Sequence, residues 1–122
     1  MDKRIIEVRT DGAGAPRGEP GEPAPEKRVR GEPKTLTYNH FEGEEGRLYC
    51  GIWESTAGTV KINYTEWEFC HLIAGEAILT STEGERWTFK EGSAFIIPPG
   101  FEGTWETVRP VRKHYVILTP KE

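Results

Sequence analysis

Hydrophobic and polar residues alternate in short runs from residue 34 to the end of the chain. The runs are rich in Val, Ile, Thr, Tyr, Phe and Trp, and Gly, Asn or Pro interrupts them about every eight to twelve residues. Alternation with a period of two predicts strands, and no segment keeps the roughly 3.6-residue apolar period of an amphipathic helix. We expect strands at residues 35–41, 48–54, 59–64, 68–73, 77–81, 86–90, 94–97, 104–108 and 113–118.

Strands this short and this numerous predict a closed, all-β architecture. Residues 82–85 (Thr-Glu-Gly-Glu) separate two alternating runs and are typical of a hairpin turn. Closure into a barrel or jelly roll is a common way for antiparallel sheets to remove their exposed edges. We therefore expect one β-barrel domain at residues 34–122.

Residues 1–33 differ from the rest of the chain in composition. Between residues 11 and 33, ten of 23 residues are Gly or Pro, and Val29 is the only aliphatic side chain larger than Ala. Such a stretch has too little apolar surface to offset the entropy lost on ordering, and proline cannot donate a hydrogen bond to a sheet. A flexible or extended N-terminal segment is the expectation for residues 1–33.

The charge of the 122-residue chain narrows the classes of partner. Sixteen Lys and Arg against 20 Asp and Glu give a net charge of −4, which argues against nucleic acid and anionic membranes. No apolar run reaches the roughly 18 residues of a spanning helix, and the N-terminal residues lack the apolar part of a secretory signal. These features predict a cytoplasmic protein. Cys50 and Cys70 fit that compartment as buried thiols, with a single bridge between them as the alternative.

Two strand segments carry candidate chemistry. Alternation in residues 59–64 separates Val60, Ile62 and Tyr64 from Lys61 and Asn63. Residues 68–73 are largely apolar on both faces, and Glu68 and Cys70 share one of them. One face is therefore expected to line an interior, and the other to be covered by a second sheet or a second copy of the chain. A homodimer is the predicted assembly.

Two short motifs carry a resemblance to the cupin superfamily. Glu68 and Gly75 follow the spacing E-x6-G of the first cupin motif, and Gly92, Pro98 and Gly100 follow the spacing G-x5-P-x-G of the second. The resemblance covers residues 34–118 and implies a jelly-roll barrel, or double-stranded β-helix.

The motifs lack the residues that bind metal in many cupins. The histidine positions of the first motif fall on Lys61 and Asn63, and the histidine and asparagine positions of the second fall on Gly103 and Thr107. A metal-bearing cupin brings three histidines and a glutamate together, a set that suits divalent transition metals. Only Glu68 remains here, so no metal and no other cofactor is predicted.

The sequence is also similar to the single-domain cupins related to the cupin domain of ureidoglycine aminohydrolase. The similarity lies in residues 51–56, 68–71, 103–106 and 110–113. In this alignment the enzyme's metal ligands fall on Ile62, Tyr64 and Glu68, and of these only Glu68 is a candidate metal ligand. The resemblance implies the fold, but the hydrolase activity does not carry over.

The missing ligands predict an ion pair in place of a metal. Lys61 takes a histidine position, and its ammonium would repel a cation beside Glu68. An unpaired buried charge costs several kcal/mol, so we expect Lys61 and Glu68 to pair inside the barrel. The alternative for Lys61 is that its ammonium reaches out to solvent.

Three functions are compatible with this sequence. The leading one is a metal-free cupin that binds a small polar or anionic molecule. Its predicted site residues are Trp53, Lys61, Asn63, Tyr64, Glu68, Cys70 and Trp105. The second is an enzyme of hydrolase or isomerase type, using Glu68 with a weakly bound metal or Glu68 and Lys61 as acid and base. The third is a structural dimerisation module whose pocket is packed shut by Leu72, Trp105 and Tyr115.

Overall fold

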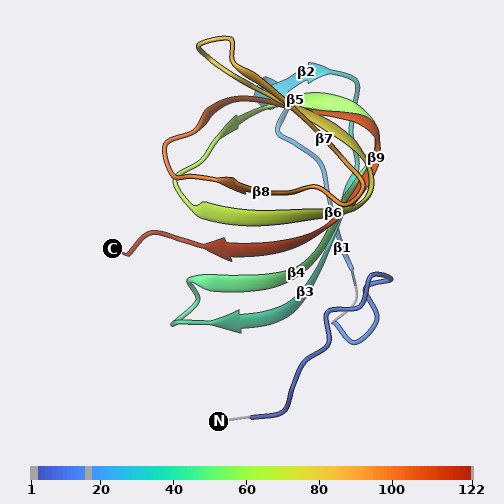
Figure 1. The fold of residues 1–122 in the computed structure, drawn as a ribbon, viewed down its shortest axis with the longest axis vertical. Coiled ribbons are helices and arrows are strands. Elements are labelled where there is room, and N and C mark those ends of the chain that lie inside the picture. The colour runs from blue at the N-terminus through green and yellow to red at the C-terminus, as the bar shows by residue number, and fades with distance from the viewer. Residues whose placement is uncertain (1–2, 16–17, 122) are drawn as a thin grey trace.

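The computed structural model describes residues 3–15 and 18–121 of the chain. The predicted all-β architecture is confirmed, because the regular elements in these residues are strands apart from one short 3-10 turn, η1 (Pro25–Lys27). The strands are β1 (Glu19–Gly21), β2 (Arg28–Arg30), β3 (Thr35–Gly43), β4 (Leu48–Ser55), β5 (Gly58–Asn63), β6 (Trp67–Ser81), β7 (Arg86–Lys90), β8 (Ala94–Ile97) and β9 (Glu102–Leu118) (Figure 1). Within these described ranges no helix has the length and apolar character needed to cross a membrane.

The strands form one curled sheet that rolls into a barrel (Figure 1). Its order is β1-β3-β4-β9-β5-β2, and β6 joins it through β9 while also pairing with β7 and β8. The first part of β6 pairs with β8 and the end of β9, whereas its second part pairs with β7 and the start of β9. β6 and β9 therefore belong to both halves of the barrel and connect them.

Both long strands bend where the sequence predicted an interruption. The division into strands at 68–73 and 77–81, and at 104–108 and 113–118, is wrong, because β6 and β9 continue through Gly75 and Pro110. Gly75 has a φ of +90°, and a Cβ atom there would lie 2.2 Å from the carbonyl oxygen of Pro110. Only glycine permits this close approach and this conformation without strain. The strands therefore turn the corner of the barrel without ending.

The N-terminal segment adds two short strands to the barrel. β1 pairs antiparallel with β3, and β2 with β5, so residues 19–30 join two edges of the rolled sheet. The flexibility predicted for residues 1–33 stays a prediction. Residues 1–2 and 16–17 of that segment, and residue 122 of the predicted barrel domain, lie outside the described residues.

Residues ahead of β1 lie against the outer face of the sheet. The Arg112 side chain donates a hydrogen bond to the carbonyl oxygen of Thr10 at 3.0 Å, and Nε2 of His114 lies 3.2 Å from that of Val8. His71 stacks beside His114 on this face, with 3.3 Å between their Nδ1 atoms. These histidines therefore lie outside the barrel.

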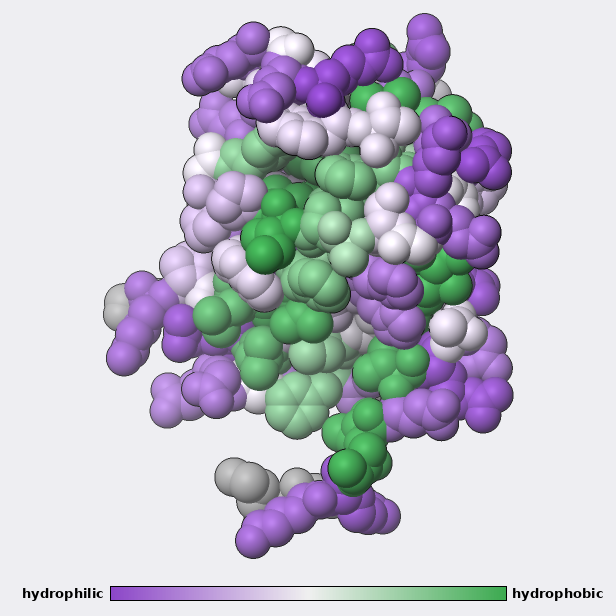
Figure 2. Space-filling model, viewed as in Figure 1, coloured by the Kyte–Doolittle hydropathy of each residue, from purple (hydrophilic) through white to green (hydrophobic). Residues whose placement is uncertain are grey.

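The same outer face also carries apolar side chains. Strand pairing places one row of them across β3, β4, β9, β6 and β8, namely Phe41, Cys50, Val116, Phe69 and Ile96. Ile96 is 54% exposed and Phe41 is 41% exposed. Figure 2, drawn in the view of Figure 1, shows hydrophobic residues gathered over β8, β6, β9 and β4. We call this row the outer apolar row.

The interior is divided between a packed core and an open cavity. The core consists of Cys70, Leu72, Ala77, Leu79, Ile97, Trp105 and Val111. Cys70 is completely buried in it, as the sequence predicted, whereas Cys50 is only half-buried; both are free cysteines. The cavity lies on the other side of Trp105, whose indole belongs to the core and also faces the open space.

Candidate functional site

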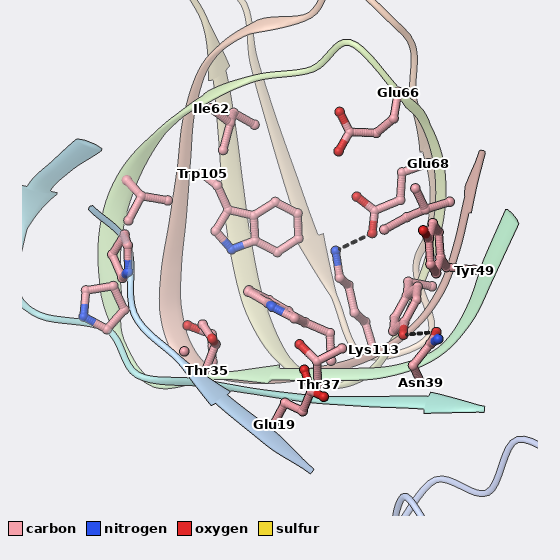
Figure 3. A pocket seen from close by; sticks show the side chains of 18 of the residues that line it. Glu19, Thr35, Thr37, Asn39, Tyr49, Ile62, Glu66, Glu68, Trp105 and Lys113 are labelled. Atoms are coloured by element: carbon pink, nitrogen blue, oxygen red, sulfur yellow. Dashed lines mark hydrogen bonds and ion pairs between the residues drawn. The ribbon is translucent and has the colours of Figure 1, made fainter. Parts of the chain in front are cut away.

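The barrel encloses a cavity of about 860 Å³. Its apolar wall consists of side chains from β4, β5 and β9, with Tyr64 just after β5: Trp53, Val60, Ile62, Tyr64, Trp105 and Tyr115. Figure 3 shows Ile62 and Trp105 on one side of the space and Glu66, Glu68 and Lys113 facing into it. Exposed residues of β1, such as Glu19, belong to the same lining, so the cavity opens to solvent beside that strand.

An ion pair lies in the wall of the cavity. Glu68 on β6 and Lys113 on β9 come from neighbouring strands, and Nζ of Lys113 donates to Oε2 of Glu68 at 2.8 Å. Only 3% of Glu68 and 4% of Lys113 are exposed. The hydroxyl of Tyr64 donates to Oε1 of the same carboxylate at 2.6 Å. Both carboxylate oxygens therefore have a hydrogen-bond donor, as a buried charge requires.

Two indole rings flank the ammonium. Nζ of Lys113 lies 4.7 Å from the ring centroid of Trp53 and 4.6 Å from that of Trp105. The two rings meet edge to face, with 5.7 Å between their centroids. Both distances to Nζ are within the range of cation–π attraction, which is strongest for tryptophan. The Trp105 N–H donates to the Thr107 hydroxyl at 2.9 Å, so this buried indole also has its polar partner.

The charges of this cluster are fixed at neutral pH. Burial lowers the pKa of Lys113, but Cys70 and Glu68 against the ammonium raise it, and the balance holds it at about 12. Burial raises the pKa of Cys70 to about 12, and burial together with Glu68 raises the pKa of Tyr64 well above 10. Lys113 is therefore an ammonium, Cys70 a thiol and Tyr64 a phenol.

A polar wall runs along β3 and β1. Thr35, Thr37 and Asn39 alternate along β3 and line the cavity. The hydroxyl of Tyr115 donates to Oδ1 of Asn39 at 2.7 Å, and Figure 3 marks this bond by the dashed line at Asn39. The amide nitrogen of Asn39 is left as a donor for a bound molecule, judged on the described residues. Glu19 of β1 pairs with Thr37 and adds a carboxylate at the opening.

The structure brings four of the predicted site residues together and leaves three outside the cavity. Trp53, Tyr64, Glu68 and Trp105 line it. Cys70 does not; it lies in the core, with its sulfur 3.4 Å from Nζ of Lys113. Lys61 and Asn63 are exposed on the outer face of β5.

The predicted pair between Lys61 and Glu68 is therefore wrong, and Lys113 is the partner of Glu68. Counting back from Glu68 assigned Lys61 to the inner face of its strand. The alternation places Val60 and Ile62 inside instead, and the structure follows the alternation.

Lys113 was missed, although the sequence contains a signal for it. The residue keeps the phase of Val111 and Tyr115, which are both buried, whereas Arg112 and His114 face outward. A lysine on the apolar face of a strand indicates a buried charge and requires an acidic partner. Its identification depended on the pairing of β6 with β9, which brings together two residues 45 positions apart.

The residues of the cavity do not fit the divalent metal of other cupins. No group of three or more His, Cys, Asp and Glu within the described ranges is placed to hold a metal ion. Glu68, the surviving ligand position, already binds the Lys113 ammonium at 2.8 Å. That positive charge repels a metal cation from the same carboxylate.

The comparisons with known proteins agree with the fold. A family described as EutQ-like cupin domain matches residues 42–115. No curated protein shows a significant sequence match. A protein of unknown function from Pseudomonas syringae pv. tomato, assigned to the DUF861 family, is similar in structure, with 25% identity over 84% of this chain and a TM-score of 0.76. This chain spans 44% of that protein.

Two further structures are similar at lower identity. The Clostridium difficile EutQ protein is 23% identical, with a TM-score of 0.64 over 73% of this chain and 65% of its own. A putative ethanolamine utilization protein from Salmonella typhimurium is 20% identical, with a TM-score of 0.62 and 71% coverage of each chain. These two likenesses show the fold alone. The family match extends from the end of β3 to Tyr115 and spans most of the barrel, so this chain belongs to the EutQ-like cupin domain family.

Proposed function

We propose that the barrel binds a small polar molecule without a metal. The observation that carries this proposal is the cavity of about 860 Å³, with indole and aliphatic side chains on one side and hydroxyl, amide and carboxylate groups on the other. Sites for small molecules commonly combine apolar walls with a few placed polar groups. A molecule with one flat or apolar side and one hydrogen-bonding side fits this arrangement.

The charge of the lining favours a neutral or cationic molecule over an anion. Glu19, Glu42 and Glu66 line the cavity, and none of them forms an ion pair within the described part of the chain. Glu68 offsets the charge of Lys113. The anion receptor predicted from Lys61 and Asn63 loses its basis, because both residues face outward. An anionic ligand stays the alternative.

Catalysis is the runner-up. The predicted acid–base pair becomes Glu68 with Lys113, since Lys61 is outside the cavity. The pKa of Lys113, at about 12, keeps it protonated at neutral pH, so it supplies a fixed charge and does not exchange protons readily. A relationship to ureidoglycine aminohydrolase stays a prediction. It does not support metal-dependent catalysis here, because Ile62 stands at one of the ligand positions and has no atom that can bind a metal. The open cavity argues against a pocket packed shut by Leu72, Trp105 and Tyr115.

The proposal includes a homodimer. The outer apolar row provides a surface for a second copy, because its end members Phe41 and Ile96 are exposed, the three residues between them are half-buried, and apolar patches of this kind commonly mark interfaces. Light scattering on the eluting protein tests this: a single-copy mass, unchanged by Ile96→Asp, argues against a dimer through this face. The cytoplasmic location stays a prediction.

The binding proposal is tested by blocking the cavity. Val60→Trp places a large side chain inside it, whereas Lys61→Trp places the same side chain on the outer face of β5. Ligand-observed NMR with neutral, cationic and anionic fragments is expected to show binding to the wild type and to Lys61→Trp, and loss of binding in Val60→Trp. Fragments that bind Val60→Trp equally well, or no binding by any class, would overturn the proposal.

A further inference from the structure

The surroundings of the Lys113 head group are those of an amine receptor. A carboxylate oxygen of Glu68 accepts from Nζ at 2.8 Å, and the indoles of Trp53 and Trp105 lie 4.7 and 4.6 Å from it. Carboxylates and tryptophan rings are the groups that bind organic ammonium ions by charge and by cation–π attraction. These three side chains therefore have the chemistry of a binding site for an ammonium ion, and the ammonium of Lys113 occupies it.

The receptor is held in place without the lysine. Tyr64 donates to the second carboxylate oxygen of Glu68 at 2.6 Å, which orients the carboxylate from the other side. Thr107 accepts from the Trp105 indole at 2.9 Å, and the two indoles contact each other edge to face. These contacts do not involve Lys113. Removal of its head group therefore leaves the Glu68 carboxylate and the two indole rings around the space that the ammonium occupied.

The receptor lies at a position where many cupins bind a metal. Glu68 stands at the one metal-ligand position where this chain keeps a ligand side chain, and that carboxylate serves the ammonium. A tethered ammonium cannot dissociate, whereas a metal exchanges with the solution. The barrel therefore carries a permanent internal cation whose presence does not depend on metal supply.

We propose that Glu68, Trp53 and Trp105 form an alkylammonium-binding site that Lys113 occupies in place of a metal, and that the site binds a free primary amine when the Lys113 side chain is shortened. The inference rests on these contacts and is independent of which molecule enters the cavity. Tethering keeps the site filled in the wild type, so free amines do not compete there.

The test is rescue of Lys113→Ala by a matched amine. The substitution removes three carbons and the ammonium, and n-propylammonium supplies those same atoms. We expect it to raise the folding equilibrium constant of Lys113→Ala about elevenfold when present at ten times its dissociation constant. The readout is urea unfolding followed by tryptophan fluorescence. If Lys113→Ala is unfolded without amine, the expected result is recovery of the near-ultraviolet circular dichroism signal on its addition.

Controls separate this site from other causes of stabilisation. n-Propanol and sodium chloride at equal concentration are expected to give no rescue, and n-propylammonium is expected to stabilise the wild type far less than Lys113→Ala, because Lys113 keeps the site filled. The double variant Glu68→Gln/Lys113→Ala is expected to lose the response, because the carboxylate is gone. The double variant Glu68→Gln/Lys113→Met has a neutral pair of similar volume at this position. It is expected to fold, and its stability is expected not to change when amine is added.

Three outcomes would overturn the inference. One is equal stabilisation of Lys113→Ala by n-propanol, which would indicate cavity filling alone. Another is a response that persists in Glu68→Gln/Lys113→Ala. The third is stabilisation of Lys113→Ala by zinc with none by n-propylammonium, which would show that the vacated position is a metal site.

Discussion

The inner wall of the cavity and its opening are built in opposite ways. Around Lys113, strands β4, β6 and β9 surround a buried ion pair whose carboxylate oxygens both have donors. At the opening, β1 is a three-residue strand whose residues are all exposed. The cavity therefore combines a wall that fixes its chemistry with a border that only main-chain pairing and surface contacts hold.

The ion pairs of the two regions show the same contrast. Glu68 and Lys113 are almost completely buried, whereas Glu22 and Lys34, at 2.6 Å, have side chains that are 52% and 61% exposed. A short distance does not make the exposed pair strong, because water and salt screen it. Loss of one partner from the buried pair leaves a charge without solvation. The difference teaches that burial, more than distance, decides which contact the fold depends on.

The largest expected effect follows removal of the charge on Glu68. Glu68→Gln leaves the Lys113 ammonium buried without a counter-charge, and we expect the free energy of unfolding to fall by about 3–5 kcal/mol. Urea unfolding measures this. Glu66→Gln is the matched control, since Glu66 lines the same cavity without an ion pair among the described residues. Equal effects of the two substitutions would show that the pairing of Glu68 with Lys113 is not what makes this carboxylate important for stability.

A smaller effect is expected for the second donor to the carboxylate. Tyr64→Phe deletes the hydroxyl that donates to Glu68 at 2.6 Å, and hydrogen bonds to charged groups contribute roughly 1.5–3 kcal/mol. Tyr115→Phe removes the neutral bond to Asn39, worth about 1 kcal/mol. The comparison of their unfolding free energies tests whether the charged acceptor makes the difference. A larger loss in Tyr115→Phe would contradict it.

Alkaline pH is expected to weaken the inner wall. The pKa of Cys70 is about 12 in the folded chain against 9.0 for a free thiol, so above pH 9 the unfolded chain releases a proton that the folded chain keeps. The free energy of unfolding then falls by up to about 1.4 kcal/mol per pH unit. The pKa of Lys113 is raised from 10.5 to about 12 in the folded chain, so above pH 10.5 it lowers the free energy of unfolding further.

Urea unfolding at pH 8, 9 and 10 measures this dependence. In Cys70→Ala the decline between pH 9 and 10 is expected to become shallower. A decline of unchanged slope in that variant would assign the effect to other groups.

The strand pattern predicted most of the barrel, and its failures have physical causes. β7 and β8 begin and end where the alternation predicts. β6 and β9 were divided at Gly75 and Pro110, because these residues usually interrupt strands and the bend that uses them arises only from packing of the sheet. β1 and β2 were missed because their sequences lack apolar alternation, and their pairing depends on the edges of β3 and β5.

The site was half predictable for a related reason. Glu68 was identified from motif spacing, and Trp53, Tyr64 and Trp105 as aromatic side chains suited to the walls of a pocket; all four line the cavity. The prediction for Lys61 was wrong because it followed the residue count of the motif and not the inward and outward alternation along its own strand. The contact of Glu68 with Lys113 depends on the antiparallel register of β6 and β9, a long-range property that a local pattern does not contain.

The smallest expected effect on stability concerns the opening. Glu22→Gln removes the charge that pairs with Lys34 and, at 3.7 Å, with Arg28, and we expect no measurable change in the free energy of unfolding, because the Glu22 side chain is itself 52% exposed. Hydrogen exchange is expected to respond, since local opening involves only the weakest contacts. The amides of β1 should exchange faster in Glu22→Gln, while those of β6 and β9 stay as in the wild type. In the wild type itself, β1 should already exchange faster than β6, because its three residues pair with one strand only, whereas β6 pairs with three. Equal protection of β1 and β6 would show that the opening is as firmly held as the inner wall, and access to the cavity would then require opening of the barrel itself.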